Sequence, residues 1–322
     1  MNIPTISEYL DSFDFDIRFH QDARWIDQKC TPDVVCIIAD CVVNLVEDNQ
    51  DQEFTVNDIW DSEYFNENVK DVFSKPDPQN PTARSEYDKF IQQPLRMLGY
   101  AQILNCEKRG TTNYYSVKNF EILEFIALKE RNAYLFLYEY IVRVLEDSEL
   151  LRIFDDFKES YKNNHAPKQR FQELKRAYED YILEYTPING RVEIRRIFSK
   201  VINPYAVMNN IAGTSRGRIS PHPLHYSELM YNRVNWRDIG KNKQLTRQEF
   251  DEAQDQPKAQ AITKYLVQKA KNQIRRMYDG SEVQDELAVG QATQIHHIFP
   301  ENEYPHLAAF LENLIKLTPS QH

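Results

Sequence analysis

The sequence is poor in glycine, with 8 glycines among 322 residues. Glycine-rich loops that cradle phosphate groups need several glycines at close spacing, and proteins built mostly of β-strands need glycine in their many turns. A glycine-loop nucleotide-binding protein and a mostly β architecture are therefore both disfavoured. The composition predicts an α+β protein that is mainly helical.

Long apolar runs are also missing. The most apolar stretch, VVCIIADCVVNLV, is interrupted by Asp40 and is too short to span a bilayer. The N-terminal stretch MNIPTISEYLDSFDFD contains neither a basic region nor an apolar core, so it does not fit a signal peptide. We expect a cytoplasmic protein without a membrane partner.

Cysteine is scarce as well. The 4 cysteines, Cys30, Cys36, Cys41 and Cys106, include no CxxC pair. Paired spacing of this kind is the usual sign of a zinc site or a redox site, so neither is predicted here. Free thiols in a reducing compartment are the simplest interpretation.

Acidic residues are concentrated at the front of the chain. Residues 1–82 hold 5 Lys+Arg against 18 Asp+Glu, a balance of −13, whereas the whole chain carries −10. The remaining residues therefore carry −10 − (−13) = +3. Any polyanionic partner is expected to contact these later residues.

The front of the chain predicts three helices followed by a β-hairpin. The helices are expected over 31–49 behind an N-cap at Thr31, from Thr55 or Asn57 onward, and over 80–100. Two strand-like runs then flank Gly110. This order predicts a winged-helix-like domain over 1–125, and a generic helical subdomain with a hairpin is the alternative.

A winged helix would carry its DNA contacts on its third helix and its hairpin. Arg84 and Lys89 lie on the third predicted helix, and Lys108 and Arg109 lie in the hairpin. The acidic first half of this region makes contacts with another protein an equal alternative.

Residues 126–190 predict a helical connecting region whose aromatic residues recur at the spacing typical of a core. The composition then changes, and residues 191–322 predict the part of the chain that contacts DNA. Basic residues alternate there with tyrosines and loop formers, a mixture that suits a phosphodiester backbone. A solvated basic surface that pairs with the acidic front is the alternative.

Two basic segments supply the candidate DNA-binding residues. Arg216 and Arg218 lie in a loop whose glycines let the backbone approach a groove, so we expect them to read bases. The predicted helix 257–280 is strongly basic, and we expect Lys269, Arg275 and Arg276 to contact phosphates.

Four of the 8 histidines fall in the final stretch of the chain, which reads TQIHHIFP and later LTPSQH. The doublet His296-His297 follows a strand-like run and precedes a proline; Asn313 comes later, and His322 stands nine residues after Asn313. This pattern resembles the HNH (ββα-metal) nuclease motif. Segments such as EIRRIFSKVINPYAV are similar to HNH-type type II restriction endonucleases.

The resemblance implies a role for each residue. His297 is the general base that activates water, and Asn313 ties down the loop that orients His297. His296 and His322 bind one divalent metal ion, with Mg²⁺ as the first choice and Mn²⁺ as another. The ββα element covers 290–322. An imidazole is a suitable base near neutral pH, and a metal ion relieves charge on phosphate.

The pattern departs from the family in two ways. Many members hold a structural zinc with cysteine pairs, which this chain lacks. The final helix has barely begun at His322, where Thr318 is the expected N-cap and Pro319 the first helical residue. We expect that a natural form continues for at least two more turns, and that the 322-residue chain binds DNA but cleaves it poorly.

The sequence thus predicts a metal-dependent endonuclease that cuts double-stranded DNA, in the manner of a sequence-specific restriction enzyme acting as a homodimer. One alternative is a nuclease directed at modified or phage DNA. Another is a non-catalytic winged-helix DNA-binding protein with a degenerate nuclease motif.

Overall fold

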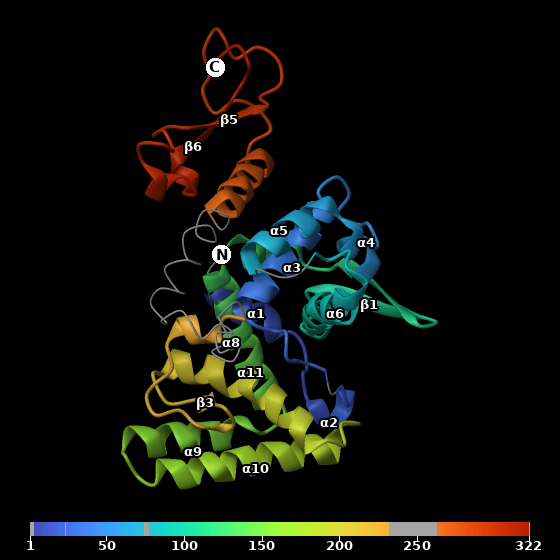
Figure 1. Ribbon diagram of the computed structural model, residues 1–322, viewed down its shortest axis with the longest axis vertical. Helices are drawn as coiled ribbons and strands as arrows, with labels where there is room; N and C mark the ends of the chain where they lie inside the picture. Colours follow the sequence, from blue (N-terminus) through green and yellow to red (C-terminus); the bar gives the residue numbers. More distant parts are fainter. Residues whose placement is uncertain (1–2, 23, 74–76, 232–262, 322) are drawn as a thin grey trace, which may run out of the picture. The chain divides into compact units, whose positions relative to one another are not determined.

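The structure is a computed structural model that describes residues 3–22, 24–73, 77–231 and 263–321. It is mainly helical, and its described strands form two-stranded antiparallel sheets (Figure 1). The α+β, mainly helical class expected from the sequence is confirmed. The chain divides into two compact units, Met1–Asn66 with Pro76–Arg233 (unit 1) and Glu67–Lys75 with Val234–His322 (unit 2).

The elements that precede residue 232 are numbered in chain order. They are α1 (Ile3–Leu10), α2 (Ile17–His20), α3 (Pro32–Leu45), α4 (Val56–Asp61), α5 (Glu63–Phe73), η1 (Pro81–Ala83), α6 (Arg84–Tyr100), β1 (Leu104–Arg109), β2 (Thr112–Val117), α7 (Phe120–Leu128), α8 (Glu130–Asp147), α9 (Leu151–Lys162), α10 (Pro167–Tyr185), α11 (Arg191–Asn209), β3 (Thr214–Ser215), β4 (Arg218–Ile219) and η2 (Tyr226–Leu229).

Helix α3 is the centre of unit 1. It begins at Pro32 behind Thr31, and nearly all of its residues are buried. A helix that is buried on nearly every side is stable only when other elements surround it. α7 and α8 pack against it and supply most of that cover.

The expected hairpin follows α6. β1 and β2 pair antiparallel, with Arg109 opposite Thr112, and Gly110 takes the left-handed conformation that the tight turn requires (φ 63°). Phe54 adds a short third bridge because its backbone exchanges hydrogen bonds of 2.8 Å with Tyr115. The segment before α4 is thereby attached to the edge of the hairpin.

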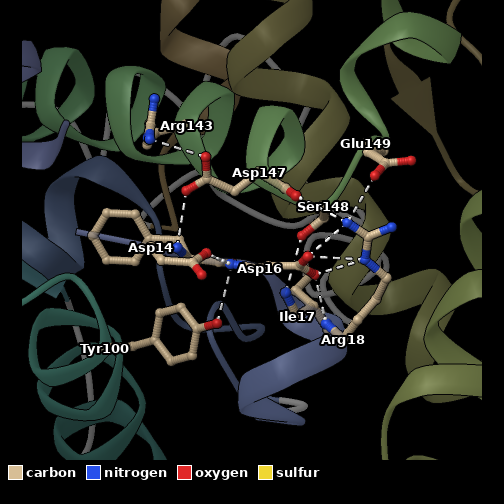
Figure 2. Close-up of polar contacts among 10 residues, drawn as sticks. Asp14, Asp16, Ile17, Arg18, Tyr100, Arg143, Asp147, Ser148 and Glu149 are labelled. Carbon is tan, nitrogen blue, oxygen red and sulfur yellow. Dashed lines mark hydrogen bonds and ion pairs between the residues drawn. The ribbon is translucent and has the colours of Figure 1, made fainter. Parts of the chain in front are cut away.

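A buried polar cluster fastens the N-terminal segment to unit 1 (Figure 2). Asp16 is buried and caps α2, where its carboxylate accepts hydrogen bonds from the backbone and guanidinium of Arg18. Ser148 accepts the Ile17 N–H at 3.1 Å, and Asp147 accepts the Phe15 N–H at 2.9 Å. The turn between α8 and α9 therefore holds this segment in place.

The compact units do not follow the boundaries expected from the sequence. Residues 1–125, 126–190 and the start of 191–322 were expected to be separate, but they contribute to the same unit. The physical reason is that α3 packs against α7 and α8, and α8 in turn packs against α11. The predicted connecting region is thus part of a shared core.

Unit 2 contains a helix over 263–277 and a β-hairpin. Its other elements are β5 (Gln294–His297), η3 (Pro305–Leu307), η4 (Leu311–Asn313) and β6 (Leu314–Leu317). A small apolar cluster of Ala270, Ile274 and Leu314 joins the helix to the hairpin.

Lys316 on β6 completes the junction between this helix and the hairpin. Its side chain is buried, and its ammonium donates to the backbone carbonyls of Arg275 and Tyr278. These carbonyls have no partner within the helix, and the negative end of the helix dipole favours a cation there. Lys316 therefore fixes β6 against the end of the helix.

Within the described residues, no helix combines the length and the apolar character that crossing a membrane requires.

Candidate functional site

The histidine doublet lies at the end of a strand. β5 and β6 pair antiparallel, with His296 opposite Ile315 and His297 opposite Leu314. Regular pairing stops at His297, although the Ile298 N–H still bonds the Asn313 carbonyl at 2.8 Å. Neighbouring strand residues point to opposite faces, so a doublet can converge on one site only where the strand ends.

The ring of His297 is held by a backbone carbonyl. Its Nε2 lies 3.0 Å from the Ala308 oxygen, and Ala308 is buried. A carbonyl oxygen only accepts hydrogen bonds, so this contact requires a proton on Nε2, and the neutral ring then carries its lone pair on Nδ1. His297 thus has one nitrogen used for orientation and one nitrogen with the electron pair of a base.

Asn313 holds the loop that carries Ala308. Its side chain is buried, accepts the Phe299 N–H at 2.7 Å, and donates to the carbonyls of Phe299 and Leu307 at 3.1 and 3.2 Å. Both ends of the 299–307 loop are tied to one amide group. These contacts match the arrangement that the resemblance implies for the loop, while the catalytic roles of His297 and Asn313 stay predictions.

The expected metal site is described only in part. His296 is half-buried at the end of β5, and His322 lies outside the described residues. Among the residues that the structure describes, no three His, Cys, Asp or Glu side chains gather into a group that could hold a metal ion. His296 and His322 therefore stay predicted ligands.

The turn before His322 has part of a helix N-terminus. The side-chain oxygen of Gln321 accepts the Thr318 N–H at 3.0 Å, which is one half of a capping box. The Gln321 N–H bonds the Thr318 carbonyl at 3.1 Å. The Thr318 hydroxyl lies 2.9 Å from the Leu287 carbonyl and 3.2 Å from the Gln321 side-chain oxygen. The Gln321 half of the box is therefore present at Thr318, whereas no backbone N–H bonds the Thr318 hydroxyl among the described residues.

Lys269 does not lie on the exposed side of its helix. Only 4% of the residue is exposed, and its ammonium lies 3.2 Å from the Tyr265 hydroxyl. The ammonium is buried against Tyr265, one turn earlier on the same helix, so it does not extend into solvent as the expected phosphate contact requires. It is not available in this position to a partner in solution.

The two arginines at the end of the same helix are more accessible. Arg275 is exposed and donates to Asn272 at 2.6 Å, and Arg276 is partly buried. Their phosphate contacts stay predictions. Residues 257–262 of the expected helix lie outside the described residues.

Arg216 and Arg218 occupy the tip of the β3–β4 hairpin in unit 1. Both are exposed, and Arg216 and Gly217 have positive φ angles of 52° and 77°. Lys175 on α10 donates to the Gly217 carbonyl at 2.8 Å, which supports the turn. A rigid exposed tip with two arginines is compatible with base reading, which stays a prediction.

Several basic residues of the predicted DNA-contacting part are engaged by acids of unit 1. Arg191 and Arg195 on α11 both bond the buried carboxylate of Glu179 on α10, at 3.2 and 2.8 Å. The two arginines are exposed, and their ion pairs with the buried Glu179 join α11 to α10 at the surface of unit 1. The count of basic residues in the sequence could not reveal that partner.

Replacing Asn313 with alanine is expected to release the loop and slow cleavage. The variant loses three side-chain hydrogen bonds, each worth about 0.5–1.5 kcal/mol, and leaves the Phe299 N–H without its acceptor. Amide hydrogen exchange over 299–308 should accelerate while exchange in α3 stays unchanged. Unaltered exchange at Phe299 would show that the loop holds itself in place.

Comparison with protein-family models, with curated proteins and with solved structures finds no match to this chain.

Proposed function

We propose that this protein is a metal-dependent endonuclease that hydrolyses phosphodiester bonds in double-stranded DNA, in the manner of HNH-type type II restriction enzymes. The observation that carries the proposal is the orientation of His297 at the end of β5 by the Ala308 carbonyl, within a loop that Asn313 holds. A histidine held in this way has one defined basic nitrogen, which general-base catalysis needs.

His297 would remove a proton from the attacking water through Nδ1. Its Nε2–H bond to Ala308 keeps the ring in one tautomer and stabilises the positive charge that develops on the ring. Asn313 acts at a distance, because it touches the loop and not the reacting atoms. The chemistry is hydrolysis, in which water attacks phosphorus and the 3′ oxygen leaves.

His296 and His322 would bind the metal ion, which when bound neutralises charge on the phosphate and the leaving oxygen. Two imidazoles are softer donors than the oxygen ligands that Mg²⁺ prefers, so the donor set fits Mn²⁺ at least as well as Mg²⁺. Activity should therefore be measured with each ion in turn.

The front of unit 1 supports the finer proposal of a winged-helix-like domain that binds DNA. α3, α4 and α6 precede the β1–β2 hairpin, and Phe54 pairs with the hairpin edge. Arg84, Lys89 and Lys108 are exposed. Arg109 is engaged by Glu53 at 2.7 Å and by Glu107 at 2.5 Å, so its charge is largely compensated within the hairpin.

The same features favour the second candidate, a non-catalytic winged-helix DNA-binding protein.

Incubation of the purified chain with supercoiled plasmid and Mg²⁺ or Mn²⁺ distinguishes the endonuclease from the non-catalytic DNA-binding protein. Discrete bands that disappear with a chelator support a sequence-specific endonuclease, and smearing supports a non-specific one. Because the 322-residue chain is expected to cleave slowly, the incubation is extended over many hours, and retarded plasmid that stays intact with either metal throughout contradicts the nuclease proposal. Analytical centrifugation of the DNA complex tests the proposed homodimer.

A further inference from the structure

Unit 1 contains a polar groove along one face of α6. Two adjoining hollows of about 490 and 520 Å³ share Arg24, Arg96 and Glu193 as lining residues. Segment 24–29 and the first turns of α11 form the remaining walls of the 490 Å³ hollow. Lys89, Gln93 and Arg96 lie at helical spacing, so α6 presents them along the same side of the groove.

The lining of the 490 Å³ hollow consists of charged and amide side chains alone. Pockets for small molecules are mostly apolar, with a few polar groups that fix orientation. A wall that is polar throughout instead suits a ligand with hydrogen-bonding groups along its length. The two hollows adjoin at Arg24, Arg96 and Glu193, so a ligand can contact both.

Many of the charges in the groove already have partners. Arg24 bonds Asp27 at 2.8 Å and Glu193 at 2.6 Å, and Lys29 bonds Glu86 at 2.5 Å. Among the described residues, the side chains of Lys89 and Arg196 make no hydrogen bond or ion pair, and both are exposed. The two cations of the groove that make no hydrogen bond or ion pair among the described residues therefore lie on α6 and α11.

Gln93 presents a donor with a fixed orientation. Its side-chain oxygen accepts the Lys29 N–H at 2.8 Å, which leaves the amide NH₂ directed away from that contact. A fixed NH₂ group recognises acceptors such as those on the groove edges of guanine and thymine. Asp88, exposed in the same groove, offers an acceptor for the amino group of cytosine or adenine.

We propose that this groove binds DNA and determines sequence preference, with Lys89 and Arg196 on phosphates and Gln93 on a base edge. The proposal rests on the proposed function in that the ligand is DNA. It differs from the recognition expected at Arg216 and Arg218, because it assigns specificity to the face of α6 together with α11 and segment 24–29.

The experiment measures binding of the full chain to a pool of duplexes with a randomised centre, without metal, over a range of salt concentrations. Lys89→Gln with Arg196→Gln should weaken binding to all sequences and reduce the slope of log K against log salt by about 1.8, since each phosphate contact contributes about 0.9. Lys168→Gln removes an exposed lysine of α10 and serves as the matched control.

Gln93→Glu tests base reading without disturbing the fold. The glutamate keeps an oxygen for the Lys29 N–H but replaces the NH₂ donor with an acceptor. Enrichment at one base position should fall by on the order of 10-fold, and affinity for every sequence in the pool should fall as well, because the glutamate adds a negative charge beside the DNA.

Each outcome bears on a separate proposal. If the wild-type chain binds and enriches sequences but the groove variants behave like Lys168→Gln, the groove proposal is overturned and the endonuclease proposal stands. If the groove variants respond as expected and the wild-type chain cuts no DNA with any metal, the groove is supported and the endonuclease proposal fails. Absence of DNA binding by the wild-type chain overturns both.

Discussion

His297→Ala is expected to reduce DNA cleavage by about 10²–10⁴-fold while the affinity for DNA stays nearly unchanged. The ring is oriented by the Ala308 carbonyl, and its Nδ1 is the nitrogen that keeps the lone pair. Alanine removes the base but leaves the β5–β6 pairing, which depends on the backbone. Initial rates on plasmid and equilibrium binding without metal measure the two effects separately.

His306→Ala is the matched control for this prediction. His306 is an exposed histidine in the loop between the same two strands, and its ring lies against Tyr304. We expect near wild-type cleavage from it. A His297→Ala variant that cuts at the rate of the wild type would contradict the general-base assignment. Equal reductions in the cleavage rate of both variants would indicate that the loop is damaged.

Asp16→Ala is expected to lower the free energy of unfolding of unit 1 by about 2.5–4 kcal/mol. Asp16 is an N-cap, worth about 1 kcal/mol, and the charged hydrogen bonding between its buried carboxylate and the partly exposed guanidinium of Arg18 adds about 1.5–3 kcal/mol in total. Asp16→Asn keeps an oxygen at the cap and should cost about half as much. Urea unfolding followed by circular dichroism measures both.

The effect of Asp16 should depend on pH. Burial would raise the pKa of Asp16, but the hydrogen bonds from the Arg18 side chain and backbone outweigh burial and hold the pKa below its ordinary value. A group with a lowered pKa in the folded state stabilises the fold above its unfolded pKa, about 3.9, and loses that contribution as pH falls further.

The difference between wild type and Asp16→Asn should accordingly be full at neutral pH and shrink as the pH falls below about 4. Asp156→Asn changes an exposed carboxylate of α9 and should stay within about 0.5 kcal/mol of the wild type. A pH-independent difference would show that Asp16 acts through shape alone.

The sequence predicted those elements of unit 1 whose ends are marked by a capping residue, a proline or a turn glycine. Thr31 and Pro32 marked the start of α3, and Gly110 marked the tight turn of the β1–β2 hairpin. These features depend on the backbone preferences of single residues, which a sequence states directly. The strand that ends in His296 and His297 was found in the same way.

No helix was predicted over Arg191–Asn209, because its basic residues and tyrosines were interpreted as a DNA-contacting segment. Ile194, Ile197 and Val201 recur at helical spacing and are buried, a signal that could have predicted it. Pro204 lies inside the helix without ending it.

Other features could not be read from neighbouring residues at all. The carbonyl that orients His297 belongs to the backbone of Ala308. Every residue has such a carbonyl, so the sequence cannot show which one bonds the ring. Lys269 looked like part of a basic surface because a charge count does not distinguish the faces of a helix. Glu179, which binds Arg191 and Arg195, lies on a different helix from both.

The polar cluster around Asp16 has a consequence for the order in which the chain folds. Its bonds join residues that are 129 to 132 positions apart, so segment 14–18 is synthesised long before its partners on the α8–α9 turn. Long loops must close before such contacts form, which slows folding. Strands β5 and β6 pair over a far shorter separation. The β5–β6 hairpin is therefore expected to form quickly after synthesis, whereas the N-terminal segment of unit 1 stays undocked until the turn between α8 and α9 has been synthesised.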